Sequence, residues 1–169
     1  MSENGNMFKR EFLRVLLVMF VLFSTALAHA QPVLGWLEKV YVYSDSEQIA
    51  LLAKIDSGAD HSSLHATDIE FYTKQNLDWV RFKTVNSSLI ERPLYRYAQI
   101  KTKQGGVQQR AVISLDICID GQKRTVETNL VNRSHYTRPF LIGRSALSGM
   151  LINPSKTDLA SQIECEKPE

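Results

Sequence analysis

The sequence of 169 residues lacks several features that define large classes of protein. Two cysteines are too few for a disulfide-rich scaffold. No Gly-rich loop ends in Gly-Lys-Ser or Gly-Lys-Thr, so the chain has no phosphate-binding loop for ATP. Its 20 basic and 18 acidic residues nearly balance, which argues against the one-sided basic face of a nucleic-acid binder. We therefore expect neither a nucleic-acid partner nor a nucleotide cofactor.

The N-terminus has the composition of an export signal. Basic residues up to Arg14 precede an apolar run at 15–28, and small residues stand at Ala28 and Ala30, where a signal peptidase reads. The run is shorter than the roughly 20 residues that span a bilayer. We predict a signal peptide over residues 1–30, cleaved near Ala30, with no stable membrane anchor and a periplasmic or secreted product.

The remainder fits one domain, which we place at 31–156, followed by a polar tail at 157–169 that we expect to be loosely held. Removing the three basic and two acidic residues of the signal leaves 17 basic and 16 acidic residues. Cys118 and Cys165 could pair in an oxidising compartment and tie down the tail. Nothing in the sequence fixes the geometry that pairing requires, so this question stays open.

The mature chain reads mostly as β-strand. Residues 39–44 alternate polar and apolar, and 49–55 form an apolar run suited to a strand buried on both faces. Two hairpins are predicted, one around 104–107 and one with Asp120-Gly121 in a type I′ turn. Aromatic residues are interpreted as core and cross-strand packing residues, although alternate tyrosines could also line a peptide cleft: Trp36, Trp79, Tyr41, Tyr43, Tyr95 and Tyr97.

Helix is predicted only as one or two short turns, one within 62–72 and one at 144–150 that ends at Gly149. The fold class is therefore all-β, small and mostly antiparallel.

The stretch that carries chemistry is Asp56-Ser57-Gly58-Ala59, at the end of the apolar run. Gly58 allows a sharp turn and close approach of another backbone, and Ser57 can hydrogen-bond to neighbouring backbone and brace the loop. An isolated motif of this kind often only caps a turn. Here a second motif follows downstream, two apolar residues and then Gly143 and Arg144.

The segments "AKIDSGADHSSLHATDI", "IKTKQGGVQQRAVISLDI" and "VNRSHYTRPFLIGRSALSGMLINPSK" resemble a bacterial family of retropepsin-like aspartic endopeptidases, formerly labelled ATP-dependent zinc proteases. The resemblance runs from about residue 35 to 156. It implies a retropepsin-like acid-protease β-barrel, Asp56 as the catalytic residue and no cofactor. Ser57, Gly58, Ala59, Asp60, Gly143 and Arg144 then support the active-site loop, with Asp60 and Arg144 as an ion pair near a dimer contact.

An aspartic peptidase needs two carboxylates that share a proton, because two like charges a few ångströms apart cannot both ionise. The chain has one Asp-Ser-Gly, so the second Asp56 must come from another copy, in a symmetric homodimer. The substrate implied is a peptide or protein, bound extended beneath a flap. The loop 86–93 and the hairpin at Gly105-Gly106 are the flap candidates, and the sequence does not choose between them.

Two alternatives remain open. A non-catalytic peptide-binding module would keep the fold without turnover. A zinc hydrolase would use His61 and His65, whose H-x-x-x-H spacing puts them on one face if the segment is helical, with His135 or an aspartate as a third ligand. The family tends to have threonine or a similar small residue at position 61, so no family role carries over to His61.

Overall fold

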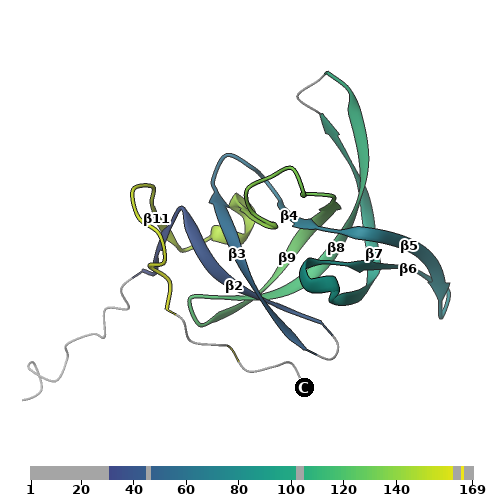
Figure 1. The fold of residues 1–169 in the computed structure, drawn as a ribbon, viewed down its shortest axis with the longest axis horizontal. Coiled ribbons are helices and arrows are strands. Elements are labelled where there is room, and N and C mark those ends of the chain that lie inside the picture. Colours follow the sequence, from purple (N-terminus) through teal and green to yellow (C-terminus); the bar gives the residue numbers. More distant parts are fainter. Residues whose placement is uncertain (1–30, 45–46, 102–104, 162–164, 166–169) are drawn as a thin grey trace, which may run out of the picture. The chain divides into compact units, whose positions relative to one another are not determined.

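The structure is a computed structural model that describes residues 31–44, 47–101, 105–161 and Cys165 (Figure 1). The predicted signal peptide at 1–30 and most of the end of the tail lie outside the described residues. Within the described ranges, none of the helices has the length and hydropathy needed to cross a membrane.

The described chain consists of strands joined by short turns and two 3₁₀ helices, as the all-β prediction requires. In chain order the elements are β1 (Val33–Gly35), β2 (Leu37–Tyr43), β3 (Gln48–Asp56), β4 (Ser62–His65), β5 (Thr67–Lys74), β6 (Leu77–Lys83), η1 (Val85–Ser87), β7 (Leu89–Lys101), β8 (Val107–Ile119), β9 (Gln122–Val131), β10 (Phe140–Gly143), η2 (Arg144–Leu147) and β11 (Leu151–Asn153).

Six of these strands close into a ring. The larger sheet has the order β2-β3-β10-β4-β9-β8-β7-β6-β5, and an additional pairing of β2 with β8 joins the first six strands end to end. β10 runs parallel to β3, and β4 runs parallel to β9. Beyond the ring, β7, β6 and β5 continue the sheet outward (Figure 1). The expected β-barrel is thus present.

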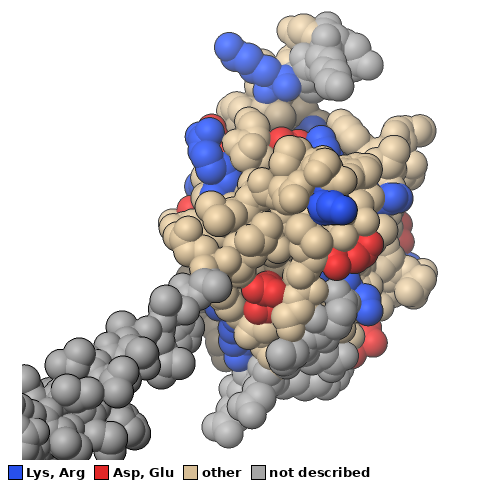
Figure 2. Space-filling model, turned by 90° about the vertical axis from the view of Figure 1, so that its left-hand side faces the viewer, with Lys and Arg blue, Asp and Glu red and all other residues tan. Residues whose placement is uncertain are grey.

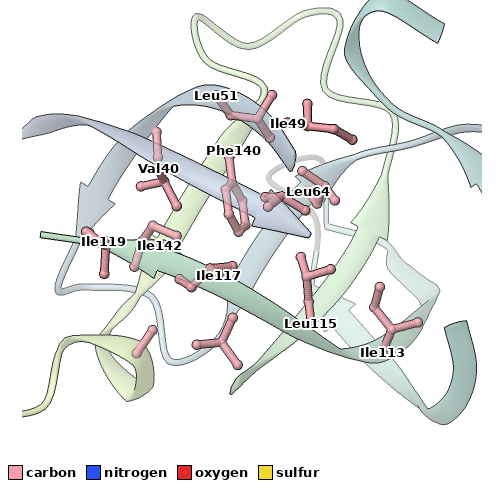
Figure 3. Close-up of a cluster of buried hydrophobic side chains, with 14 of the residues drawn as sticks. Val40, Ile49, Leu51, Leu64, Ile113, Leu115, Ile117, Ile119, Phe140 and Ile142 are labelled. Carbon is pink, nitrogen blue, oxygen red and sulfur yellow. The ribbon is translucent and has the colours of Figure 1, made fainter. Parts of the chain in front are cut away.

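The apolar core fills this ring, with Phe140 and Ile142 of β10 among residues from β2, β3, β4 and β8 (Figure 3). The prediction that 49–55 is buried on both faces is wrong. Ile49, Leu51 and the other odd-numbered residues of β3 are buried, whereas Ala50 and Leu52 are exposed, because only one face of β3 faces the interior of the ring.

β2 shows the opposite departure, since both of its faces are buried where simple alternation was predicted. Val40 and Val42 enter the barrel core, while Tyr41 and Tyr43 pack with Cys118 and Cys165 in a second cluster on the other face. The prediction of packing tyrosines therefore holds on β2. It is wrong for Trp36 and Tyr95, which are 42% and 62% exposed, whereas the exposed Tyr97 does pack its ring beside that of Phe71, 6.0 Å away.

The turns are mostly where the sequence placed them. Asp120 and Gly121 join β8 to β9 with φ angles of 53° and 66°, as a type I′ turn requires. η2 supplies the helical turn predicted at 144–150, and Gly149 follows it with a φ of 77°. The helical turn predicted within 62–72 is wrong, because that segment forms β4 and β5 and obtains its hydrogen bonds from neighbouring strands.

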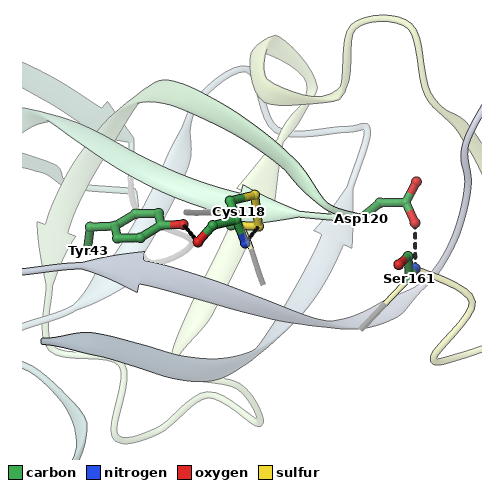
Figure 4. The surroundings of a disulfide bond; sticks show 5 residues. Tyr43, Cys118, Asp120 and Ser161 are labelled. Atoms are coloured by element: carbon green, nitrogen blue, oxygen red, sulfur yellow. Dashed lines mark hydrogen bonds between the residues drawn. A yellow bond between two sulfur atoms is a disulfide. The ribbon is translucent and has the colours of Figure 1, made fainter. Parts of the chain in front are cut away.

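The C-terminal segment is fastened to the barrel, contrary to the expectation of a loose tail. Cys118 and Cys165 form a disulfide, and the Tyr43 hydroxyl donates to the Cys165 carbonyl at 2.9 Å (Figure 4). The Ser161 N–H donates to Asp120 Oδ1. The buried Glu38 carboxylate accepts from the backbone N–H groups of this segment at positions 159 and 160. We call these contacts the C-terminal clasp.

Charged side chains are dispersed over the surface rather than separated by sign. On the face shown in Figure 2, basic and acidic groups alternate among wide uncharged areas. Much of this charge is paired locally, as in Arg81 with Glu70 and Lys83 with Asp68.

Candidate active site

Asp56 is the last residue of β3, where the strand leaves the barrel and enters the loop that leads to β4. Its carboxylate is 26% exposed. One oxygen accepts the Gly58 N–H at 3.1 Å, and the other accepts from the Lys54 ammonium at 3.0 Å. Lys54 reaches it because residues two apart in a strand lie on the same face.

This environment favours the ionised carboxylate. The pKa of Asp56 is held below its ordinary value, chiefly by the hydrogen bond from Lys54. The charge of Lys54 and the N–H groups of Gly58 and Ala59 act in the same direction, while partial burial opposes them. Within a single chain Asp56 is therefore suited to accept a proton rather than to donate one.

The loop after Asp56 is held against β10, in the way that the second motif predicts. Gly143 is the register partner of Asp56. A Cβ atom on Gly143 would lie 2.5 Å from the carbonyl carbon of His61, so this position has no room for a side chain. The Gly143 N–H donates to Ser62 Oγ at 3.2 Å, and the Arg144 N–H donates to the Ala59 carbonyl at 2.7 Å.

The expected ion pair between Asp60 and Arg144 is present, on the exposed side of the loop. The Ser145 N–H also donates to the Asp60 carbonyl at 3.1 Å. Ser57 is exposed, and its role in supporting the loop stays a prediction.

A row of polar side chains extends from this loop across β4, β9, β8 and β7. Ser63 donates to Asn129 Oδ1 at 3.1 Å, and Asn129 donates back to the Ser62 carbonyl at 2.7 Å. Arg110 of β8 donates to the same Asn129 oxygen at 3.1 Å. The polar face of the sheet is thus joined to the Asp56 loop by direct hydrogen bonds.

Two arginines beside this row have no acidic partner in the described part of the chain. Arg133 is buried, donates through Nε to the Arg138 carbonyl at 3.2 Å, and lies over the Tyr136 ring at 4.5 Å. Burial lowers the pKa of both guanidinium groups, and the Asp56 carboxylate acts in the opposite direction on Arg133. Because arginine stays protonated, Arg133 leaves positive charge near Asp56, and Arg110 adds positive charge to the polar row.

The histidines are placed apart and have other partners. His61 lies 3.8 Å from Glu127, which Arg96 binds at 2.6 Å, and His65 Nδ1 accepts the Arg133 N–H at 2.9 Å. Position 62 begins a strand, so residues 61 and 65 are on the order of 13 Å apart along it rather than one helical turn. Within the described ranges, no three His, Cys, Asp or Glu side chains lie close enough together to hold a metal. His135 is exposed in the loop before β10.

The two flap candidates differ in the structure. Residues 86–93 are taken up by η1 and by the start of β7, which pairs with β6 inside the sheet. β7 and β8 pair as far as Lys101 and Val107 and project as a hairpin, whose turn lies partly outside the described residues (Figure 1). The structure thus presents the Gly105-Gly106 hairpin as the projecting element.

Sequence reasoning missed Lys54, Arg110 and Arg133. Lys54 had a usable signal, because strand alternation places it beside Asp56. The arginines had none, since they reach the site only through the pairing of β8 with β9 and the fold of the loop at 132–139.

Comparisons with known proteins agree with this geometry. A family model described as "RimB-like: Retropepsin-like aspartic endopeptidase RimB" matches residues 33–162. A protein named "Probable alpha-L-glutamate ligase" from Shewanella halifaxensis is 34% identical over 116 residues, 64% of this chain and 25% of that protein. One of the same name from Desulfotalea psychrophila is 29% identical over 110 residues, 61% of this chain and 24% of that protein. The chain thus spans about a quarter of the length of these curated relatives.

Among solved structures, Lpg0085 from Legionella pneumophila, a protein of unknown function, matches with a TM-score of 0.67 and 26% identity, over 78% of this chain and 100% of that one. The fold, the Asp56 loop held on β10 and the match over most of the chain lead to one conclusion: this chain belongs to the RimB-like family of retropepsin-like aspartic endopeptidases.

Proposed function

We propose that the protein is an exported aspartic endopeptidase in which Asp56 activates the water that attacks a peptide carbonyl. The observation that carries the proposal is the Asp56 loop itself. An accessible carboxylate is fixed by the Gly58 N–H and by Lys54, in a loop whose Ala59 carbonyl accepts the N–H of Arg144, the residue after β10. Such fixed geometry is what general base catalysis requires.

The reaction needs a second carboxylate. One Asp56 removes a proton from water as the oxygen bonds to the carbonyl carbon, and the second gives its proton to the carbonyl oxygen. The tetrahedral intermediate then collapses: the first Asp56 gives the proton it took from water to the amide nitrogen, a hydroxyl of the intermediate returns a proton to the second Asp56, and the C–N bond breaks to release the amine and the carboxylic acid. Because Lys54 keeps Asp56 ionised in one chain, a neighbouring Asp56 is needed to raise the pKa of one of the pair. The active form is therefore a homodimer.

The flap of this enzyme is the β7–β8 hairpin, and the substrate lies extended beneath it, pairing its backbone as an added strand. Export, by a signal peptide at residues 1–30, is in keeping with the disulfide, since such bonds persist in oxidising compartments.

The substrate carries carboxylates near the scissile bond. Arg110 supports this, because its guanidinium is only partly buried and has no acidic partner in the described residues, and such a group recognises carboxylates well. The relatives named as probable glutamate ligases fit the same chemistry, since a glutamate-adding enzyme makes an acidic product.

The test is cleavage of a mixed peptide library, read by mass spectrometry from acid to neutral pH, with and without chelator. The full chain is purified oxidised, together with Asp56→Asn and a matched exposed control, Asp78→Asn. Cleavage by the wild type and the control that resists chelator and is lost in Asp56→Asn supports the proposal. Activity that survives in Asp56→Asn, or resides in a monomer by sedimentation, overturns it. Binding of acidic peptides by a dimer without any cleavage favours the non-catalytic module.

A further inference from the structure

An open pocket of about 980 Å³ lies outside the Asp56 loop, where β5 leaves the barrel. Its lining comes from three places: the beginning of β5, the β7–β8 hairpin and the end of β9. None of the residues to which we assign catalysis lines it.

The pocket lies where β5 diverges from β4, the strand before it in the chain. β4 belongs to the ring, but β5 pairs only with β6 within the described sheet, at the far edge of the strand order. The register of β5 shifts between Thr67 and Glu70, and Asp68 in this shift has a φ of 50°. This bulge turns β5 away from the ring and leaves the space between it and β8 unfilled.

The pocket has an apolar floor and an aromatic wall. Its lining includes Ala66, Ala111 and Leu130, each buried in the barrel core. Phe71 of β5 and Tyr97 of β7 also line it, and their rings lie 6.0 Å apart. These two side chains are 52% and 47% exposed, so a pair of aromatic faces is left open beside an apolar surface.

The rim is polar and continues toward the candidate active site. Arg110 lines the pocket, and through Asn129 it is hydrogen-bonded to the backbone of Ser62 in the Asp56 loop. Asn132, also in the lining, directly precedes Arg133. The charge of Asp56 acts on the Arg133 guanidinium and raises its pKa, against the larger effect of burial. Arg110 thus lies two hydrogen bonds away from the strand that follows the Asp56 loop, a separation that an extended polypeptide of a few residues can span.

We propose that this pocket is a distal subsite that holds one aromatic or large aliphatic side chain of the substrate polypeptide, several residues from the scissile bond. The inference rests on the proposed function. It adds a binding site for an apolar side chain of the substrate, at a distance from the acidic substrate residues that would lie beside Asp56. The occupant is a polypeptide because an extended substrate held at Asp56 can reach the pocket within a few residues.

The test uses binding, so that it can be read without turnover. The probe is a labelled Glu/Ala host peptide of about twelve residues, about 40 Å when extended, in which one Phe occupies each position in turn. Affinity is measured by fluorescence anisotropy on full-length Asp56→Asn and on the same variant carrying Phe71→Ala or Tyr97→Ala. Tyr95→Ala is the matched control, because Tyr95 is an exposed tyrosine of the same strand outside the lining.

One position of Phe is expected to bind about tenfold more tightly than the all-Glu/Ala host, a gain typical of burying one aromatic side chain. Phe71→Ala and Tyr97→Ala should remove this gain and leave the host affinity unchanged, whereas Tyr95→Ala should preserve it. Thermal melts establish that each variant folds. A Phe gain absent at every position, or equal in all variants, overturns the subsite. Cleavage by the wild type without a Phe gain rejects only the subsite, and a Phe gain without any cleavage rejects only the proposed catalysis.

Discussion

Two carboxylates in this molecule, Glu38 and Asp56, have opposite uses. Glu38 is fully buried and accepts three backbone N–H groups, from Gly35, Leu159 and Ala160. Asp56 is partly exposed and accepts one backbone N–H together with the Lys54 ammonium. Both groups are fixed, but only Asp56 leaves an accessible edge. Access, rather than the presence of hydrogen bonds, therefore separates the carboxylate proposed to be catalytic from the structural one.

The largest expected effect concerns catalysis at Asp56. Asp56→Asn should lower peptide cleavage by about 10²–10⁴-fold or more, because the amide cannot take the proton from water. The free energy of unfolding should change by no more than about 0.5 kcal/mol, since the site is partly exposed. Initial rates and urea denaturation measure the two quantities. A large loss of stability would mean that Asp56, like Glu38, is mainly structural.

The next effect concerns the clasp. Cys165→Ser opens a covalent loop with a sequence separation of 47 residues, and chain entropy then predicts a loss of about 4 kcal/mol in unfolding free energy. Reduction of the wild-type protein should give a similar loss, and reductant should have no further effect on the variant. Equal melting temperatures for oxidised and reduced wild type would show that the non-covalent contacts of the clasp suffice.

Glu38→Gln should cost about 2 kcal/mol of stability, because the amide replaces one acceptor with a donor that faces a buried N–H group. Glu47→Gln, at an exposed position, is the matched control and should be neutral. Chemical denaturation gives both values. If Glu38→Gln instead removed peptide cleavage while stability stayed unchanged, the structural role of Glu38 would be wrong.

The smallest expected effect concerns how the stability contributed by Asp56 depends on pH. Lys54→Gln should raise the pKa of Asp56, whose pKa Lys54 holds below its ordinary value. Since the folded-state pKa is lowered, the contribution of this carboxylate to stability is present above its unfolded pKa and is lost as pH falls through the folded value. In Lys54→Gln the acid loss should therefore be smaller and should be complete at a higher pH, whereas Lys54→Arg should resemble the wild type. NMR titration of the Asp56 carboxyl carbon in the monomer follows the shift directly.

The comparison also shows how far the sequence leads. The Asp56 loop and its contact with Gly143 could be predicted because both depend on short motifs that need particular residues at particular positions. The burial of Glu38 could not, because its donors at 159 and 160 lie more than a hundred residues away and become neighbours only in the fold.

Local patterns failed where tertiary pairing decides the outcome. Leu52 lies in an apolar run but is exposed, since β3 has a single face toward the barrel. The segment at 62–72 has residues compatible with a helical turn, yet the parallel ladder with β9 makes its first part a strand. The pairing of Cys118 with Cys165 likewise depends on the tertiary fold, which brings Cys165 beside Tyr43 and Cys118.

One consequence follows from the unusual length of β8. Its second half is fixed by β9 on one side and by β2 on the other, while its first half pairs with β7 in the projecting hairpin. From Val112, where both halves meet, to Val107 the strand extends roughly 17 Å. A rotation of about 10° at that base moves the far end by about 3 Å, because the strand segment acts as a lever arm. As the proposed flap, the hairpin could thus adjust to substrates of different thickness while the barrel core behind it keeps its packing.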